Sequence, residues 1–262
     1  MKKYLIVFSK SMKSQFVYRS SAIASLCGSM LSFFIQICLW HALLGAGVKN
    51  GANFSDMVLF VIINSFIAIV TSSNISGSIE SGMIDGSIAL ELIRPISYKY
   101  YQFAGMAGRN VFRLVTNVVP VLAAALFLID YSALPSPPRA AAFLLSLILG
   151  VLIMFELNYL FGLSAFWIQR CWFISWYTRA FTTFFGGTAV PLWFYPDALK
   201  NVSFFLPFRY VSFEPINIFL GKTPAQDVWI PIAAAFMWLI TLGILGRIIW
   251  YRAVKRLSVN GG

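Results

Sequence analysis

The side chains that most often carry out chemistry are scarce in this chain of 262 residues. It contains nine Asp and Glu residues, a single histidine (His41) and three cysteines (Cys27, Cys38 and Cys171). A Ser-His triad or a histidine-based metal site therefore has almost no material, and the cysteines show neither a CxxC pair nor a metal-binding spacing. The chain also lacks a G-x-x-x-x-G-K-[ST] sequence, the loop that cradles phosphates in many ATPases. These residues indicate no metal site, no bound cofactor and no catalytic centre.

Glu156 is the exception, because it lies in an otherwise apolar stretch, Leu152–Asn158. An ionisable group at the depth of a bilayer costs about 2.5–3.5 kcal/mol on insertion scales, so we expect it to face protein or water. Two interpretations remain open. Glu156 is either a carboxylate on a translocation path or a structural carboxylate paired within the helix bundle, for example with Asn64.

A polar segment, Ser78–Ser97, separates two apolar stretches and is acidic first and basic afterwards. Its apolar residues recur at i, i+4 and i+8: Ile84, Ile88 and Leu92. We therefore expect residues 86–95 to form one amphipathic turn and helix that ends before Pro95, with these apolar side chains on one face. Its polar side chains remain for water or a partner: Asp85, Glu91 and Arg94. We expect this helix to lie at a membrane surface and to contact a cytoplasmic partner.

The elements that position these residues must be membrane helices. Hydrophobic residues make up 59% of the chain and charged residues only 11%, with a mean hydropathy of +0.78, whereas soluble domains average about 25% charged residues. The sequence predicts an all-α integral membrane protein forming a single domain, 1–262. Six spans of roughly 20 residues are expected: Ser21–Leu44, Phe54–Ser73, Phe103–Ile129, Ala140–Phe166, Cys171–Phe194 and Val228–Tyr251.

The formal charge of +11 reflects topology rather than nucleic-acid binding. Fifteen of the twenty Lys and Arg residues lie near the predicted inner ends of the spans: in residues 1–19, Arg94–Arg113, Arg170 with Arg179, and Arg247–Arg256. By the positive-inside rule, both termini are expected in the cytoplasm. Snorkelling to lipid headgroups is the simplest interpretation of Arg109, Arg113 and Arg179, with coupling to a partner as the alternative.

Two further segments flank the spans. Residues 1–19 alternate basic and apolar positions, which predicts an interfacial helix on the inner leaflet. Residues 190–222 are aromatic but interrupted by prolines, including Pro191, Pro196 and Pro207. We expect short re-entrant or interfacial helices there, on the outer face.

The first predicted span carries a stripe of small and polar residues: Ser25, Ser29, Ser32 and Gln36. Their spacings of four, three and four place them on one helix face. Tight packing within the subunit would explain this stripe, and so would a subunit interface or the lining of a transport path. Asn64 in the second span and Glu156 complete the candidate path.

Three stretches resemble permeases of the ABC-2 type, the membrane subunits of ABC exporters. Residues 1–19 resemble the connecting helix of that family. The sequence G-S-I-A-L-E-L-I-R-P at residues 86–95 is similar to its G-T-L-E-x-L-x-x-x-P coupling helix, in the subgroup with Arg-Pro. V-P-L-W-F-Y-P at 190–196, L-P-F-R-Y at 206–210, Glu214-Pro215 and Gly221-Lys222 resemble its outer segment. There is no large soluble extracellular domain, so lipoprotein-type exporters are a poor match.

The resemblance implies a permease subunit in a bacterial cytoplasmic membrane, with ATP and Mg²⁺ bound by a separate ATPase subunit. A second permease, identical or related, is also implied. Segment 75–98 would contact the ATPase through Asp85, Gly86, Ile88, Glu91, Leu92, Arg94 and Pro95. The substrate would be hydrophobic or amphipathic, such as a drug, a peptide or a lipid-like molecule. The alternative is a self-sufficient secondary transporter or channel that uses Glu156, although no pair of intramembrane charges and no inverted repeat supports it.

Overall fold

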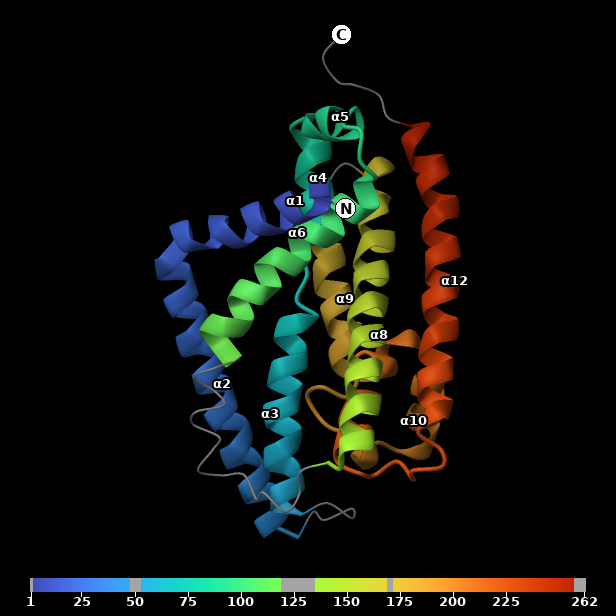
Figure 1. Ribbon diagram of the computed structural model, residues 1–262. Helices are drawn as coiled ribbons and strands as arrows, with labels where there is room; N and C mark the ends of the chain where they lie inside the picture. Colours follow the sequence, from blue (N-terminus) through green and yellow to red (C-terminus); the bar gives the residue numbers. More distant parts are fainter. Residues whose placement is uncertain (1, 48–52, 119–134, 169–171, 257–262) are drawn as a thin grey trace.

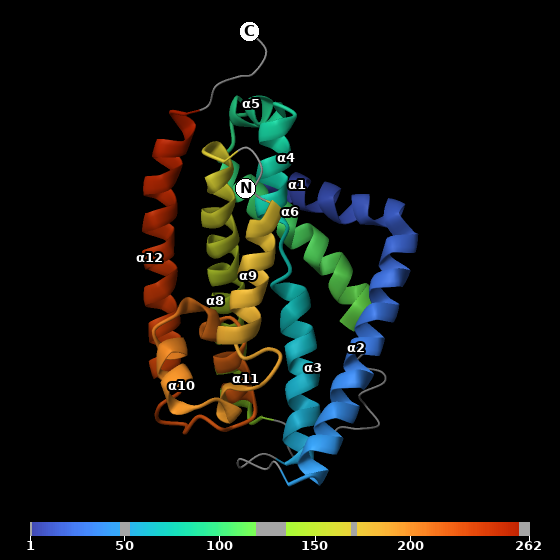
Figure 2. The same cartoon turned by 180° about the vertical axis from the view of Figure 1, so that it is seen from behind.

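The computed structural model describes residues 2–47, 53–118, 135–168 and 172–256, and every regular element in these ranges is helical. Long helices lie side by side, with short helices at both ends of the molecule (Figures 1 and 2). The structure therefore bears out the predicted all-helical membrane fold.

Four stretches within the described residues are long and apolar enough to cross a membrane. They are Ala22–Gly45 in α2 (Arg19–Gly45), Phe54–Ile84 in α3 (Phe54–Val70) and α4 (Ile75–Ile84), Pro137–Phe166 in α8 (Pro137–Gly162) and the 3-10 turn Leu163–Phe166, and α12 (Trp229–Val254). They correspond to the first, second, fourth and sixth predicted spans.

The third and fifth predicted spans have a different form. The third begins as α6 (Tyr98–Arg113) and continues as a five-residue π-helix, Leu114–Val118. Residues 119–129, where it was expected to end, lie outside the described residues, as does Cys171 at the start of the fifth. Within the fifth, α9 (Trp172–Phe185) has only 14 residues. The count of six spans thus stays a prediction.

One end of the molecule gathers the polar segment and the N-terminal helix. Helix α5 (Ser87–Leu92), the C-terminal end of α12 and α1 (Lys2–Ser14) all lie at this end (Figures 1 and 2). Helix α1 packs along α6 so closely that a Cβ on Gly108 would lie 2.3 Å from the Phe8 carbonyl oxygen. Glycine is what permits this approach.

Helix α5 falls within the turn and helix predicted for residues 86–95, but the predicted apolar face shared by Ile84, Ile88 and Leu92 is wrong. Gly86 has a φ of +73° and separates α4 from α5, a left-handed conformation that glycine adopts without steric cost. The break changes which side chains share a face. Ile84 is 63% exposed, whereas Ile88 is buried and Leu92 half-buried.

The opposite end is built from the predicted outer segment. Between α9 and α12 the chain forms two 3-10 turns, Leu192–Phe194 and Pro207–Tyr210, and two short helices, α10 (Asp197–Phe204) and α11 (Phe213–Phe219). Proline fixes φ near the value that a first helical turn needs. Accordingly, Pro191 and Pro196 directly precede a turn and α10, and Pro207 begins the second turn. Short helices in this segment were predicted.

The hydrophobic core is unevenly distributed among the helices. Its main part lies between α3, α8, α11 and α12, and a second cluster joins α4 and α6 to the ends of α8 and α12. Helix α2 stands at the edge of the helix bundle. Of the residues in its apolar stretch, 6% are buried, whereas 61% are buried in the corresponding stretch of Phe54–Ile84. On the side of α2 that faces the protein, Phe33 and Trp40 join the main core, so the polar residues of this helix require a separate explanation.

Candidate functional site

A polar cavity lies between α2, α3, the end of α6 and α9. It consists of two adjoining hollows of about 560 Å³ and 780 Å³. Both hollows are lined by Ser32, Gln36, Asn64, Ala68, Ser72, Arg113 and Arg179. Because so much of the wall is shared, we treat the two as one cavity.

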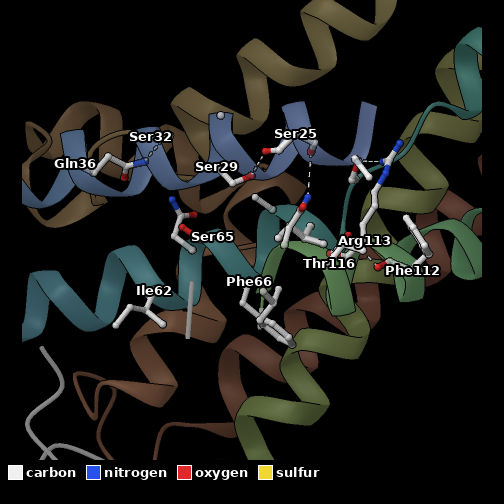
Figure 3. Close-up of a pocket in the computed structure, with 18 of the residues that line it drawn as sticks. Ser25, Ser29, Ser32, Gln36, Ile62, Ser65, Phe66, Phe112, Arg113 and Thr116 are labelled. Carbon is white, nitrogen blue, oxygen red and sulfur yellow. Dashed lines mark hydrogen bonds between the residues drawn. The ribbon is translucent and has the colours of Figure 1, made fainter. Parts of the chain in front are cut away.

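The polar stripe of α2 forms one wall of this cavity. Ser25, Ser29, Ser32 and Gln36 all line it, and Figure 3 shows them along α2, opposite α3 and the end of α6. Asn64 and Ser65 of α3 lie on the facing wall. The structure therefore brings together five of the six residues predicted for a translocation path.

The π-helix after α6 lines the cavity and contacts α2. Asn117 donates a hydrogen bond from Nδ2 to the Ser25 hydroxyl at 3.1 Å. At the end of α6, Arg113 Nη1 donates to the Ser72 hydroxyl at 2.7 Å. Asn117 was not predicted from the sequence, since a lone amide within a long apolar stretch gave no sign of its partner on α2. Arg113 was interpreted as a snorkelling residue.

All charge on the cavity wall is positive. Among the described residues, Arg113 and Arg179 are the charged side chains that line it, and neither forms a salt bridge with a described carboxylate. The rest of the wall is rich in serine, threonine, asparagine and glutamine. Among the described residues, the aromatic side chains on the wall are Phe66 and Phe112.

Several amides on this wall have unused acceptors. Asn64 and Asn117 are buried, with 7% and 4% of their surfaces exposed. Asn64 donates to the Thr188 carbonyl at 2.8 Å, but its Oδ1 has no hydrogen-bond partner, and the same is true of Asn117 Oδ1 and Gln36 Oε1. Unpaired acceptors of this kind are costly when buried. They mark places where a donor from a ligand or water would be stabilising.

Glu156, the sixth predicted path residue, lies elsewhere. Its Oε1 forms a salt bridge of 2.6 Å with Lys99 Nζ, at the start of α6, and it does not line the cavity. Lys99 also lies 5.6 Å from the centre of the Tyr159 ring. Lys99 was not predicted as the partner. It was counted only among the basic residues at the inner end of a span.

The short helix α5 presents an apolar surface to its surroundings. Leu90 is 63% exposed and Ile93 is 79% exposed, and the neighbouring Arg94 and Pro95 are exposed as well. Ile88 packs inside the second core cluster. Ile88, one of the predicted coupling residues, thus anchors the helix. Leu90 and Ile93, which were not among the predicted coupling residues, form its exposed outer surface. In sequence, Leu90 and Ile93 were indistinguishable from Ile88 and Leu92.

Two carboxylates of this segment respond to their surroundings in opposite ways. The hydroxyl and backbone N–H of Ser87 lower the pKa of Asp85, and the N–H lies 2.9 Å from Asp85 Oδ1. Desolvation by burial raises the pKa of Glu91, opposed by the nearby Arg94 charge and by a hydrogen bond from Tyr101. The Asp85 carboxylate therefore accepts a hydrogen bond from the first N–H group of α5. Glu91 is a partly buried acid near the C-terminal end of α5.

The N-terminal helix holds the end of the same segment. Lys3 Nζ donates to the Pro95 carbonyl at 3.3 Å, and the Ser97 N–H donates to the Tyr4 hydroxyl at 3.1 Å. Both contacts join residues more than 90 positions apart. A displacement of α5 would therefore be transmitted to α1 as well as to α6.

At the opposite end, an ion pair joins the outer segment to α3, and further contacts lie within the segment itself. Lys222 Nζ lies 3.0 Å from Asp56 Oδ2 at the start of α3, and Trp193 donates to Asn217 at 2.9 Å. Arg209 forms a salt bridge with Glu214. The predicted outer residues Pro191, Pro196 and Pro207 shape these turns and do not line the cavity.

Comparison with known proteins gives one result. The family model described as "ABC-2 family transporter protein" matches residues 21–261, most of the chain. No curated protein and no solved structure matches the chain.

Proposed function

Because the chain belongs to the ABC-2 family of transporters, whose members are multi-pass membrane permeases that work with an ABC ATPase subunit, we propose that it is the permease subunit of an exporter. ATP and Mg²⁺ would be bound by the ATPase subunit. The permease would supply the path through the membrane. The observation that carries this proposal is the polar cavity enclosed by α2, α3, α6 and α9.

The exposed surface of α5 supports the position of the ATPase contact. Leu90 and Ile93 form an apolar patch beside Arg94, at the same end of the molecule as α1 and the end of α12. Partner contacts concentrate their binding energy in a few apolar or arginine side chains. We therefore assign this end to the cytoplasm, with both termini, in a bacterial cytoplasmic membrane.

The position of the cavity beside the outer segment supports transport by alternating access. The cavity reaches Thr188 and Ser212 in the outer segment, and α10 and α11 lie at that end of the molecule. Closure of the ATPase subunits would push α5, and α1 and α6 would follow through their contacts with residues 95–97. A second permease subunit, identical or related, would cover the sparsely buried α2.

The test is purification of the tagged chain from its native host in mild detergent, comparing wild type with Leu90→Asp/Ile93→Asp. The wild type is expected to retain an ATPase subunit with a phosphate-binding loop. The double variant should bind this subunit with an affinity that is at least tenfold lower, which corresponds to a loss of about 1.4 kcal/mol of binding free energy. Phe205→Asp, a change at a 75% exposed site of the outer segment, is the matched control.

Glu91→Gln and Arg94→Gln are expected to keep the ATPase bound but to reduce ATP-driven transport, because they alter the polar edge of the contact. Full retention of the ATPase by Leu90→Asp/Ile93→Asp would contradict the assigned contact. Isolation of the wild type alone, with ATP without effect in liposomes, would contradict the exporter proposal itself.

A further inference from the structure

We propose that the cavity between α2, α3, α6 and α9 binds a hydroxyl-bearing anion, a sugar or polyol that carries a phosphate or carboxylate. This deepens the proposed function, on which its meaning as a substrate site rests. The sequence led us to expect a hydrophobic or amphipathic substrate, such as a drug, a peptide or a lipid-like molecule, and the composition of the wall disfavours a purely hydrophobic one.

The charge on the wall is the first reason. Arg113 and Arg179 both line the two hollows, and no described lysine or carboxylate lines either. The guanidinium groups of half-buried Arg113 and exposed Arg179, with no salt bridge to a described carboxylate, create a positive potential that attracts anions and repels cations. Guanidinium groups also match the geometry of phosphate and carboxylate oxygens.

Hydrogen bonding is the second reason. Buried Asn64 and Asn117 each leave Oδ1 without a partner, and Gln36 leaves Oε1 without one. A carbonyl oxygen can only accept, so a complementary ligand must bring donors. Hydroxyl groups supply them and can also accept from the serine and threonine hydroxyls of the wall. Inorganic phosphate alone would meet the arginines but leave most of this wall unused.

The apolar content of the wall is the third reason. Sites for drug-sized hydrophobic ligands are lined mainly by apolar and aromatic side chains. In the part of the chain that the structure describes, no tryptophan or tyrosine lines this wall, and Phe66 and Phe112 are its aromatic members. Trp193 and Phe213, whose ring centroids lie 5.7 Å apart, belong to the outer segment instead, and the neighbouring Phe60 ring belongs to α3.

The charge can be tested without a known ligand. In a background with Cys27, Cys38 and Cys171 replaced by alanine, Ser32→Cys places a thiol on the wall of both hollows. Its reaction rates with an anionic and a cationic methanethiosulfonate reagent are compared in the purified permease. After each rate is divided by the rate of the same reagent with a small thiol in solution, the anionic reagent is expected to be favoured by about tenfold, and Arg113→Gln/Arg179→Gln should reduce that ratio toward unity.

Two further variants separate charge from folding. Arg113→Lys/Arg179→Lys should restore the preference for the anionic reagent. Arg247→Gln, which removes a cation over the Tyr251 ring on α12, should leave the ratio unchanged. A preference for the cationic reagent, or a ratio indifferent to both arginines, would overturn the proposal.

Protection of the same thiol identifies the source of the anion. Glucose 1-phosphate is expected to slow labelling several-fold more than glucose or inorganic phosphate at equal concentration, if the ligand is soluble. Nanodiscs of phosphatidylglycerol should slow it relative to phosphatidylcholine if the ligand is a lipid headgroup. Protection in neither arm, or equal protection by glucose, contradicts a site for hydroxyl-bearing anions.

These measurements need no ATPase. A permease that shows the anion preference but binds no ATPase would keep the inferred site and lose the exporter proposal. The reverse result would keep the exporter and lose the substrate class.

Discussion

Lys99 and Glu156 show how a membrane protein accommodates a carboxylate in an apolar helix. The 2.6 Å salt bridge joins α8 to the start of α6, and the Glu156 side chain is only 10% exposed. An isolated carboxylate there would be strongly disfavoured, whereas a paired one is tolerated. The pairing supports the structural interpretation of Glu156 and gives no support to a self-sufficient ion-coupled transporter.

We expect Lys99→Met to destabilise the permease by about 2 kcal/mol, because it leaves the buried Glu156 carboxylate without a counter-charge. Glu156→Gln should cost less, since the Lys99 side chain is 26% exposed and can reach water or headgroups. The midpoint of thermal unfolding in detergent measures both.

The double variant Lys99→Met/Glu156→Gln serves as the control for this pair. Its loss should be smaller than the sum of the single losses, because neither charge is then left alone. Additive losses would show that the two side chains contribute independently.

Single residues also show where sequence reasoning stops. The stripe Ser25–Gln36 was predictable, because helical spacing alone places its members on one face. The partner of Glu156 was not, because Lys99 is 57 positions away and only the tertiary arrangement of α6 and α8 joins the two. The choice between Ile88 and Leu90 as the outward side chain depended on the break at Gly86.

Among the helices, the contact between α1 and α6 is the tightest seen at a glycine of this end. It positions the N-terminal helix over the base of the polar segment, where Lys3 and Tyr4 reach residues 95–97. Helix α1 thus has a defined place in the fold and is more than a basic tail.

Gly108→Ala is expected to cost about 1–3 kcal/mol, the usual range for overpacking, since the added Cβ would lie 2.3 Å from the Phe8 carbonyl oxygen. The loss should be local. Hydrogen exchange in Lys2–Ser14 should become faster, while α8 and α12 keep their protection.

Gly243→Ala on α12 is the matched control, because nothing lies within 4 Å of a Cβ at that position. It should be neutral or slightly stabilising, as alanine is the better helix former. Unchanged protection of Lys2–Ser14 in Gly108→Ala would contradict the close packing of α1.

The helices could be predicted to different degrees. Long apolar stretches gave α2, α3, α8 and α12 within a few residues, since length and composition alone distinguish them. The fifth span is shorter than its predicted bounds, because α9 ends at Phe185 and Gly187 follows with a φ of +65°. At Gly86, with a φ of +73°, the chain turns between α4 and α5, so Ile84 does not share a face with Ile88.

For the molecule as a whole, the cavity has a direction. It extends from Gln15, at the junction of α1 and α2, to Thr188 and Ser212 in the outer segment. The outer segment in turn is fastened by the Lys222–Asp56 pair. On the proposed function, this cavity is a transport path that is closed at the α10 end.

Thr188→Cys, in the background with the three native cysteines replaced by alanine, is therefore expected to be labelled by a membrane-impermeant thiol reagent from the cytoplasmic side. Inside-out vesicles should label at least several-fold faster than right-side-out cells in the absence of ATP. ATP with vanadate should reverse the order if access alternates.

Phe205→Cys in the exposed part of the outer segment provides the comparison, because it should label from outside in every state. Faster labelling of Thr188→Cys from outside without ATP would contradict the assigned closed end. Labelling of Phe205→Cys only from inside would reverse the orientation of the whole chain.

The length of α9 has a consequence for the surrounding lipid. Fourteen residues rise about 21 Å, whereas the hydrocarbon core of a bilayer is about 30 Å thick. The remaining depth must be filled by the turns and short helices after Gly187 or relieved by local thinning of the bilayer. The activity of the permease should therefore depend on acyl-chain length. In bilayers of short-chain lipids the outer segment would fit without strain. In thicker bilayers hydrophobic mismatch would act on this outer segment, which is proposed to close the path.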